Sequence, residues 1–308
     1  MTKTVEGWRW RVLRAGGFML DGGAMFGVIP KPLWTRMVTP DERNRIPVQT
    51  NCLLLERDGK IVVVEVGNGD KFGAKERDIY GMEDRSILDA LHEADCRPAD
   101  VDMVIVTHLH FDHAGGLTRK PRSGEGDAPQ LTFPNARIVT QRREWEDAIA
   151  NRSTMSKTYL REHLTEEVRE RLLQVEGVTP PDPVSEIGDV RGELFPGTEV
   201  APGIEVVRMP GHTWGQQAVR FRSADGGTVV FVPDVMPTAN HASAAANMAY
   251  DVEPWVSMRM RMRLLHEASE KGWVLALDHE PGEAVVRVEA DGTKPGAYSL
   301  RSAGVTDR

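Results

Sequence analysis

The sequence predicts an α+β fold in which two β-sheets pack face to face and helices cover their outer surfaces. Short apolar strands and amphipathic helices occur in both halves of the chain. No sustained alternation of strand and helix is present, so a single parallel sheet built from βαβ units is not indicated. A sandwich with helices outside satisfies both observations.

The composition is that of a globular protein large enough to fold without disulfides. The chain has 308 residues, of which 40% are hydrophobic and 27% charged. Because such a chain can bury a large core, a bound metal is expected to serve chemistry and not folding. The net charge of -8 argues against nucleic-acid binding. We expect a single domain over residues 1–308, with residues 10–45 as an N-terminal edge or lid segment.

Three features of the sequence indicate the cellular compartment of the protein. The N-terminus has no apolar stretch of the signal-peptide kind. The longest apolar runs, such as 62–64 and 103–106, are too short to span a membrane. Cys52 and Cys96 are expected to be reduced thiols. We therefore expect a cytoplasmic protein without membrane contact.

The expected elements of the first half follow from apolar periodicity and turn residues. They are a hairpin over 49–66, a helix over 83–94, and strands over 103–106 and 136–140, with a helix over 141–150 after the second strand. The four-residue spacing of Leu160, Leu164, Val168 and Leu172 predicts one amphipathic helix. The prolines between 180 and 183 predict an internal loop.

The second half is expected to contain more strands and one long helix. The strands are predicted over 204–208, 217–222, 228–232, 274–277 and 284–288. Pro254 should open the helix and Gly272 should close it. Its core-facing stripe is predicted to comprise Trp255, Met258, Met262 and Leu265.

Four candidate metal ligands follow the strand at 103–106: His108, His110, Asp112 and His113. The first three are two residues apart, so in an extended segment they project to one side. His113 breaks this period and needs a bend, which a helix beginning near Asp112 would supply. The two glycines that follow would allow close backbone packing. Imidazole and carboxylate at this density suit zinc, iron, manganese or cobalt. A surface cluster or a tag is the alternative, and the preceding apolar strand disfavours it.

Three further candidates each stand just past a short apolar run: His212, Asp234 and His279. If those runs are strands of one sandwich, all four segments deliver side chains to one edge. His92, His163 and His266 lie on predicted helices and are expected at the surface. His241 lies in the loop after Asp234 and is expected to border the pocket.

This pattern, His-x-His-x-Asp-His with a later Gly-His, Asp and His, resembles the metallo-β-lactamase superfamily, whose fold is a four-layer αββα sandwich. The resemblance implies two divalent metal ions per chain, with Zn²⁺ favoured and Mn, Fe or Co as alternatives. It implies that His108, His110 and His212 hold one ion. Asp112, His113 and His279 would hold the other, and Asp234 would bridge the two.

A closer resemblance, spanning roughly residues 10–290, is to the YtnP-type quorum-quenching N-acyl-homoserine lactonases. It rests on residues 20–34, 107–116, 234–238 and 248–251. It implies a hydrolase that opens lactones by attack of a metal-bridging hydroxide, with Asp234 orienting the hydroxide and Asp112 acting as a ligand of the second ion. Phosphotriesterase or arylesterase activity on the same metal site stays open as the alternative. The partner is a small-molecule ester or lactone, and a homodimer is also open.

One position departs from the lactonase pattern. Many lactonases place a tyrosine three residues after the bridging aspartate, and this chain has Pro237 there. The role of that tyrosine, steadying the substrate carbonyl or the leaving group, is then either vacant or filled by His241 or Tyr250. A mononuclear iron oxygenase and a non-catalytic binding module are also conceivable, but the complete ligand set disfavours both.

The glycine-rich segment over 20–28 has two interpretations. It is either an edge loop packed on the core or an apolar wall that grips an acyl chain. In the second interpretation, Met25, Phe26 and Trp34 contact the substrate.

Overall fold

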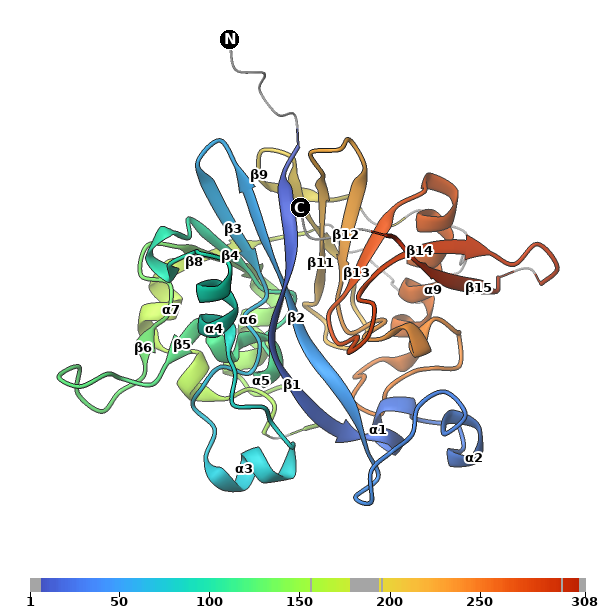
Figure 1. Ribbon diagram of the computed structural model, residues 1–308, viewed down its shortest axis with the longest axis horizontal. Coiled ribbons are helices and arrows are strands. Elements are labelled where there is room, and N and C mark those ends of the chain that lie inside the picture. Colours follow the sequence, from blue (N-terminus) through green and yellow to red (C-terminus); the bar gives the residue numbers. More distant parts are fainter. Residues whose placement is uncertain (1–6, 156, 178–193, 195, 295, 305–308) are drawn as a thin grey trace, which may run out of the picture.

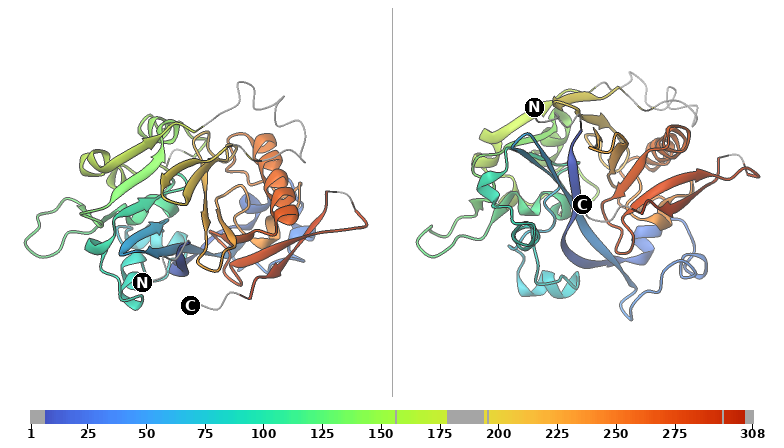
Figure 2. Two further views of the ribbon diagram at one scale, coloured as in Figure 1. Left: turned by 90° about the horizontal axis from the view of Figure 1, so that it is seen from above. Right: turned by 45° about the horizontal axis from the view of Figure 1, so that its top comes forward.

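Two β-sheets face each other and carry helices on their outer sides (Figure 1, and from above in Figure 2). The computed structural model describes residues 7–155, 157–177, 194, 196–294 and 296–304. The predicted α+β sandwich with four layers is confirmed. No described helix is both long and apolar enough to cross a membrane. Both cysteines are buried free thiols.

The first sheet comes from the N-terminal half and the second from the C-terminal half. In spatial order the first contains β1 (Arg9–Asp21), β2 (Arg45–Arg57), β3 (Lys60–Val64), β4 (Met103–Ile105), β7 (Arg137–Gln141) and β8 (Leu172–Val175). The second contains β15 (Tyr298–Ser302), β14 (Val285–Ala290), β13 (Val274–Leu277), β12 (Thr228–Val232), β11 (Gln217–Arg222), β10 (Ile204–Arg208) and β9 (Thr198–Ala201). A small ribbon pairs β5 (Thr118–Arg119) with β6 (Gln130–Leu131).

The helices are short except for α9. In chain order they are α1 (Gly22–Phe26), α2 (Lys31–Trp34), α3 (Ala74–Ile79), α4 (Ile87–Glu93), α5 (Phe111–Ala114), α6 (Arg142–Ile149), α7 (Glu166–Arg171) and α9 (Pro254–Lys271). Single 3-10 turns are η1 (Pro98–Asp100), η2 (Gly115–Leu117), η3 (Arg161–His163) and η4 (Ala239–His241).

Alternation along the strands builds the layers. Leu53 and Leu55 of β2 point to the cluster between the sheets, where they meet Phe231 of β12. Leu54, between them, points to the outer side and packs with Leu91 of α4. The second sheet does the same, since Val230 turns outward to the cluster that contains α9. Each such side chain stabilises the fold by about 1.5 to 3 kcal/mol when fully buried. Because side chains alternate along a strand, a one-residue shift of register would move the whole apolar face of that strand out of its cluster.

Strand direction brings the carboxyl ends of several strands to one edge. β3, β4 and β7 are mutually parallel neighbours, as are β12 and β13. β10 is antiparallel to β11, which is antiparallel to β12, so β10 runs in the direction of β12. The loops after β4, β10, β12 and β13 carry the candidate ligands, so all of them leave from carboxyl ends of this kind.

Buried amides join the two sheets beside this edge. The Gln217 side chain donates to the carbonyl oxygen of Val106 over 2.8 Å and accepts from the amide of Gln141 over 2.7 Å. On the other side, Asn51 of β2 donates to the carbonyl oxygen of Leu277 over 2.9 Å. These bonds fix the ends of β4 and β13 relative to the opposite sheet.

Most of the expected elements are present, and three expectations need correction. The hairpin, the strands of the second half and the helix closed by Gly272, whose φ is 66°, are confirmed. The single helix over 160–172 is wrong, because Thr165 caps α7 and Leu172 pairs with Ile138 as part of β8. Trp255 is 56% exposed and is not part of the core stripe of α9.

The third correction concerns His163, which was expected at the surface and is buried in η3. The strand β1 was not predicted at all. The loop expected at the prolines between 180 and 183 lies outside the described residues.

The close packing of the segment after the ligands gives a stability prediction. A Cβ atom on Gly115 would lie 2.1 Å from the carbonyl oxygen of Asn68 and 2.7 Å from that of Gly67. Backbone atoms cannot move aside, so Gly115→Ala should lower the free energy of unfolding by about 2 to 3 kcal/mol. The measurement is urea unfolding of the metal-free protein. Gly292→Ala, where a Cβ meets nothing within 4 Å, is the control and should change stability by less than about 0.5 kcal/mol. Equal stability of the two variants would contradict the close approach.

Candidate metal centre

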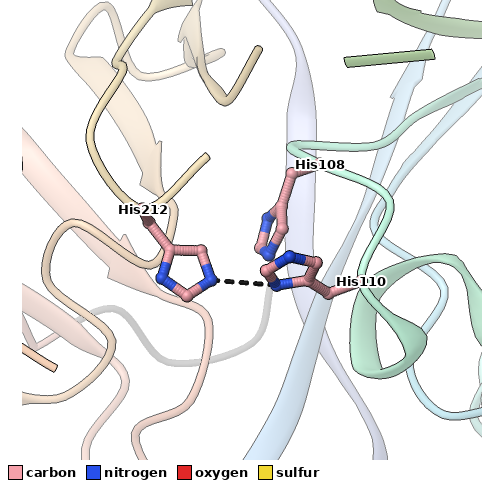
Figure 3. A group of neighbouring side chains, drawn as sticks. All are labelled: His108, His110 and His212. Atoms are coloured by element: carbon pink, nitrogen blue, oxygen red, sulfur yellow. Dashed lines mark hydrogen bonds between the residues drawn. The ribbon is translucent and has the colours of Figure 1, made fainter. Parts of the chain in front are cut away.

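Three histidines from two distant segments form the first ligand group. His108 and His110 follow β4, and His212 follows β10. One nitrogen of each lies within 4.8 Å of the others, and His212 Nε2 is 3.0 Å from His110 Nδ1 (Figure 3). Zinc held tetrahedrally at about 2.1 Å places neighbouring nitrogens about 3.4 Å apart. The group therefore has the spacing and the donor type of one metal site.

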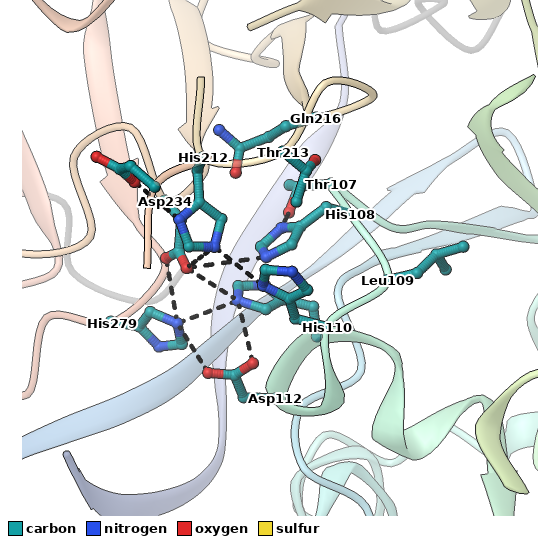
Figure 4. Close-up of polar contacts among 12 residues, drawn as sticks. Thr107, His108, Leu109, His110, Asp112, His212, Thr213, Gln216, Asp234 and His279 are labelled. Atoms are coloured by element: carbon teal, nitrogen blue, oxygen red, sulfur yellow. Dashed lines mark hydrogen bonds and ion pairs between the residues drawn. The ribbon is translucent and has the colours of Figure 1, made fainter. Parts of the chain in front are cut away.

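The second group lies beside the first. His113, Asp234, Asp278 and His279 each place a ligand atom within 4.8 Å of the others. His113 Nε2 is 3.1 Å from His279 Nε2. Asp112 lies just outside this group, with its carboxylate oxygens 3.7 Å from His113 Nε2 and 3.6 Å from His279 Nε2 (Figure 4). Its place at the edge of the group is compatible with the predicted ligand role.

Asp234 lies between the two groups (Figure 4). Its Oδ2 is 3.1 Å from His212 Nε2 in the first group and 3.7 Å from His113 Nε2 in the second. Its Oδ1 is 3.3 Å from His279 Nε2. Burial alone would raise the pKa of Asp234, but the imidazoles of His212 and His279 hold it well below its usual range. A carboxylate that contacts both groups has the position required of a bridging ligand.

In four of the five histidines, the ring nitrogen that faces away from the centre has a polar partner. The pairs are His108 with the Thr107 hydroxyl at 3.0 Å, His212 with Asp251 at 2.9 Å, His279 with the Gln49 carbonyl oxygen at 2.8 Å and His113 with Glu65 at 3.4 Å. In each pair Nδ1 is engaged and Nε2 faces the centre. Such partners fix ring orientation and raise ligand basicity in metal sites.

Several atoms that face the centre have no hydrogen-bond partner among the described residues. They are His108 Nε2 and both carboxyl oxygens of Asp278. A buried polar atom left without a partner costs about 1 to 3 kcal/mol. Burial also holds the pKa values of His108 and His110 well below their usual range, so both rings are neutral, the form that binds metals. Two divalent ions therefore fit the residues present.

A cavity of about 100 Å³ opens onto the two groups. Its floor contains metal-ligand candidates, namely His110, Asp112, His212, Asp234 and His279. Its walls are mainly apolar and aromatic: Leu20, Met25, Tyr80, Phe111, Met155, Met248 and Tyr250, with Ser153, Lys157 and Thr158 on the remaining side. The cavity therefore joins a polar floor of candidate metal ligands to apolar walls.

The structure brings some of the predicted substrate and catalytic residues to this cavity and not others. Met25 and Tyr250 line it. Phe26 does not, because its ring is stacked between Trp34 and His241, with centroids 5.5 and 5.0 Å away. His241 also does not line it, since its ring nitrogens are paired with the Thr238 hydroxyl and the Met25 carbonyl oxygen. The expected contacts of Phe26, Trp34 and His241 with substrate are thus replaced by a buried stack behind Met25.

Other residues of the site were not found from the sequence. Asp278 stands next to His279, and this adjacency was the one available signal. Burial and the charge of Asp234 raise its pKa well above the usual range. Glu65 follows β3 with φ of 65°, accepts from the Thr107 amide and contacts His113. Tyr80 follows α3, far from any motif.

Known proteins share this fold and parts of this sequence. The family model of the metallo-β-lactamase superfamily matches residues 45–119. A Bacillus N-acyl homoserine lactonase is 26% identical over 261 residues, which cover 81% of this chain and 84% of that protein. The crystal structure of a probable metal-dependent hydrolase from Staphylococcus aureus has a TM-score of 0.79 and 29% identity, covering 97% of this chain and 99% of its own.

A second structure shows the same fold at greater sequence distance. The dizinc quorum-quenching lactonase AidC has a TM-score of 0.73 and 15% identity, covering 97% of this chain and 98% of its own. Together with the two ligand groups at the carboxyl ends of the strands, these matches show that the chain has the metallo-β-lactamase fold and is similar to members of that superfamily.

Proposed function

We propose that the protein is a dinuclear metal-dependent hydrolase that opens N-acyl-homoserine lactones. The observation that carries the proposal is the cavity, in which buried metal-ligand candidates form the floor and apolar side chains form the walls. A polar, reactive end and an apolar tail are the two parts of an acylated lactone. The lactonases among the similar proteins support the same class of substrate.

The chain's own residues have separable roles in this proposal. His108, His110 and His212 would hold one ion, His113, Asp112 and His279 the other, and Asp234 both, with Asp278 adjacent to the second. When bound, such ions supply Lewis acidity and lower the pKa of a water molecule to about 7. Asp234 would orient that water and accept its proton.

Two tyrosines of the cavity are proposed to supply the hydroxyl that Pro237 lacks. Tyr80 and Tyr250 both line the cavity. Burial raises the pKa of each, and the charge of Asp112 raises it further. Both hydroxyls therefore stay protonated at neutral pH and can donate to a carbonyl or leaving oxygen. We propose that Tyr250 does so, with Tyr80 beside it.

Three finer proposals accompany the main one. Zinc is proposed because imidazole and carboxylate ligands in closely spaced groups suit it. A cytoplasmic location is proposed because both cysteines are free thiols. A homodimer is proposed because Val28, Leu33 and Met37, which lie in and around α2, are exposed large apolar side chains.

Metal content is the first test. Elemental analysis of the metal-replete protein should give two divalent ions per chain, because two ligand groups are present. Chelation should lower the melting temperature, since ions at a thousand times their dissociation constant stabilise the folded state by about 4 kcal/mol. A single ion per chain at saturation would contradict the dinuclear centre.

Asp234→Asn tests the bridging carboxylate. The variant keeps the shape of the side chain and loses one ligand oxygen and the proton acceptor. We expect kcat to fall roughly 10²- to 10⁴-fold, the usual contribution of a positioned base. Circular dichroism should show an unchanged fold. Asp225→Asn, in the exposed turn before β12, is the matched control and should retain full activity. Normal turnover of Asp234→Asn with both ions bound would exclude the proposed role.

The substrate class is tested with lactones that carry acyl chains of C4 to C12. Each methylene that reaches the apolar wall contributes about 0.8 kcal/mol, so kcat/KM should rise up to about fourfold per added CH₂. Met25→Ala should flatten this rise. Phe26→Ala should instead destabilise the fold, by about 3 to 5 kcal/mol, because Phe26 is fully buried behind Met25.

Phosphotriesters and aryl esters belong in the same panel. Rapid hydrolysis of either, with no opening of any lactone, would replace the lactonase proposal by the alternative on the same site.

A further inference from the structure

A buried carboxylate outside the ligand set connects the segments that carry the first histidine group. Glu144 lies in the first turn of α6 and is completely buried. Its Oε1 accepts from the Leu109 amide over 2.9 Å and from the Tyr159 hydroxyl over 3.2 Å. Its Oε2 accepts from the Thr213 hydroxyl over 2.6 Å.

Each of these three donors is a neighbour of a histidine of the first group, either in the sequence or by ring contact. Leu109 lies between His108 and His110 in the sequence, and Thr213 follows His212 (Figure 4). The ring of Tyr159 lies 5.0 Å from that of His110. The Glu144 carboxylate thus binds the backbone of the segment that carries His108 and His110. It also binds the side chain that follows His212 and the tyrosine whose ring contacts His110.

The start of α6 also fits tightly against the His212 segment. A Cβ atom on Gly215 would lie 2.3 Å from the Glu144 nitrogen and 2.4 Å from its Cα. Two segments about 70 residues apart in sequence therefore meet at the backbone as well as at the side chain of Glu144. Neither segment can shift relative to the other without breaking one of these contacts.

We propose that Glu144 is a positioning residue for the first metal site, where it sets the spacing of His108, His110 and His212. The inference rests on the proposed two-metal function. It predicts an asymmetry, because the hydrogen bonds of Glu144 within the described part of the chain reach no residue adjacent to His279. Weakening Glu144 should therefore affect one ion more than the other.

Asp147 provides the matched control. It lies one turn further along the same helix and is also completely buried. Its carboxylate pairs with Arg143 and Arg152, which are not adjacent to any ligand. Asp147→Asn removes a buried charge from α6, and its link to the ligand segments is only indirect, through Arg143, which lies 5.1 Å from the centre of the Trp214 ring.

The experiment compares the parent with Glu144→Gln, Thr213→Val and Asp147→Asn. The glutamine amide nitrogen can donate but cannot accept. In one amide orientation the bond from the Leu109 amide is lost, and in the other the Thr213 hydroxyl must accept instead of donating, without the charge of the carboxylate. Affinities for two successive Co²⁺ or Zn²⁺ ions are measured by competition with a chelator. We expect Glu144→Gln to weaken one ion roughly 10- to 100-fold and to leave the other unchanged. The visible spectrum of the weakened Co²⁺ site should change, and Thr213→Val should show a smaller effect on the same ion.

Asp147→Asn should bind both metal ions with the affinities of the parent. This should hold even if the metal-free form of Asp147→Asn is as destabilised as that of Glu144→Gln. The inference is overturned if Glu144→Gln binds both ions like the parent, weakens both equally, or behaves like Asp147→Asn. If Glu144→Gln does not fold, Thr213→Val alone decides by the same criterion. A parent with only one ion contradicts the proposed function, and a reduced affinity for that ion in Glu144→Gln would still support the positioning role.

Discussion

Buried imidazoles and carboxylates must each find partners, and this requirement organises the site. An unpaired buried polar atom costs about 1 to 3 kcal/mol, and the centre holds five histidines together. The partners come from both halves of the chain, since Gln49 on β2 accepts from His279 and Asp251, in the loop before α9, pairs with His212. Because neither half carries a complete set, the ligand groups can form only when the sandwich is closed. Metal binding and the docking of the two halves are thus thermodynamically linked.

The features that the sequence predicts correctly are those with a local signal. The strands of the second half show clear apolar periodicity, and every one of the predicted strands is present. The ligand segment 107–116 was readable because its residues are neighbours in the chain, and α5 supplies the bend that His113 needs. The sequence also predicts that His212, Asp234 and His279 lie close together, because each follows a strand of the same sandwich.

The failures have physical causes that no local pattern shows. The periodic leucines of 160–172 resemble a helix, but Thr165 caps a new one and the last leucine completes a strand pair with a distant segment. In β1 the register shifts between Arg14 and Gly17, which interrupts the alternation expected of a strand. Tyr80 and Glu144 reach the site through tertiary packing alone, so their roles depend on contacts across the fold.

The docking of α1 has a consequence for how this enzyme can be diversified. The Met25 carbonyl oxygen accepts from His241, and Ala24 accepts from the amide of Ala249. The wall of the cavity and the loop that follows Asp234 therefore form one mechanical unit, although more than 200 residues separate them in the chain. Recombination that imports only the N-terminal segment from a relative would replace the side chain that stacks on His241, which is Phe26 in this chain. Exchange of substrate preference between relatives requires residues 20–34 and 238–250 to be transferred together.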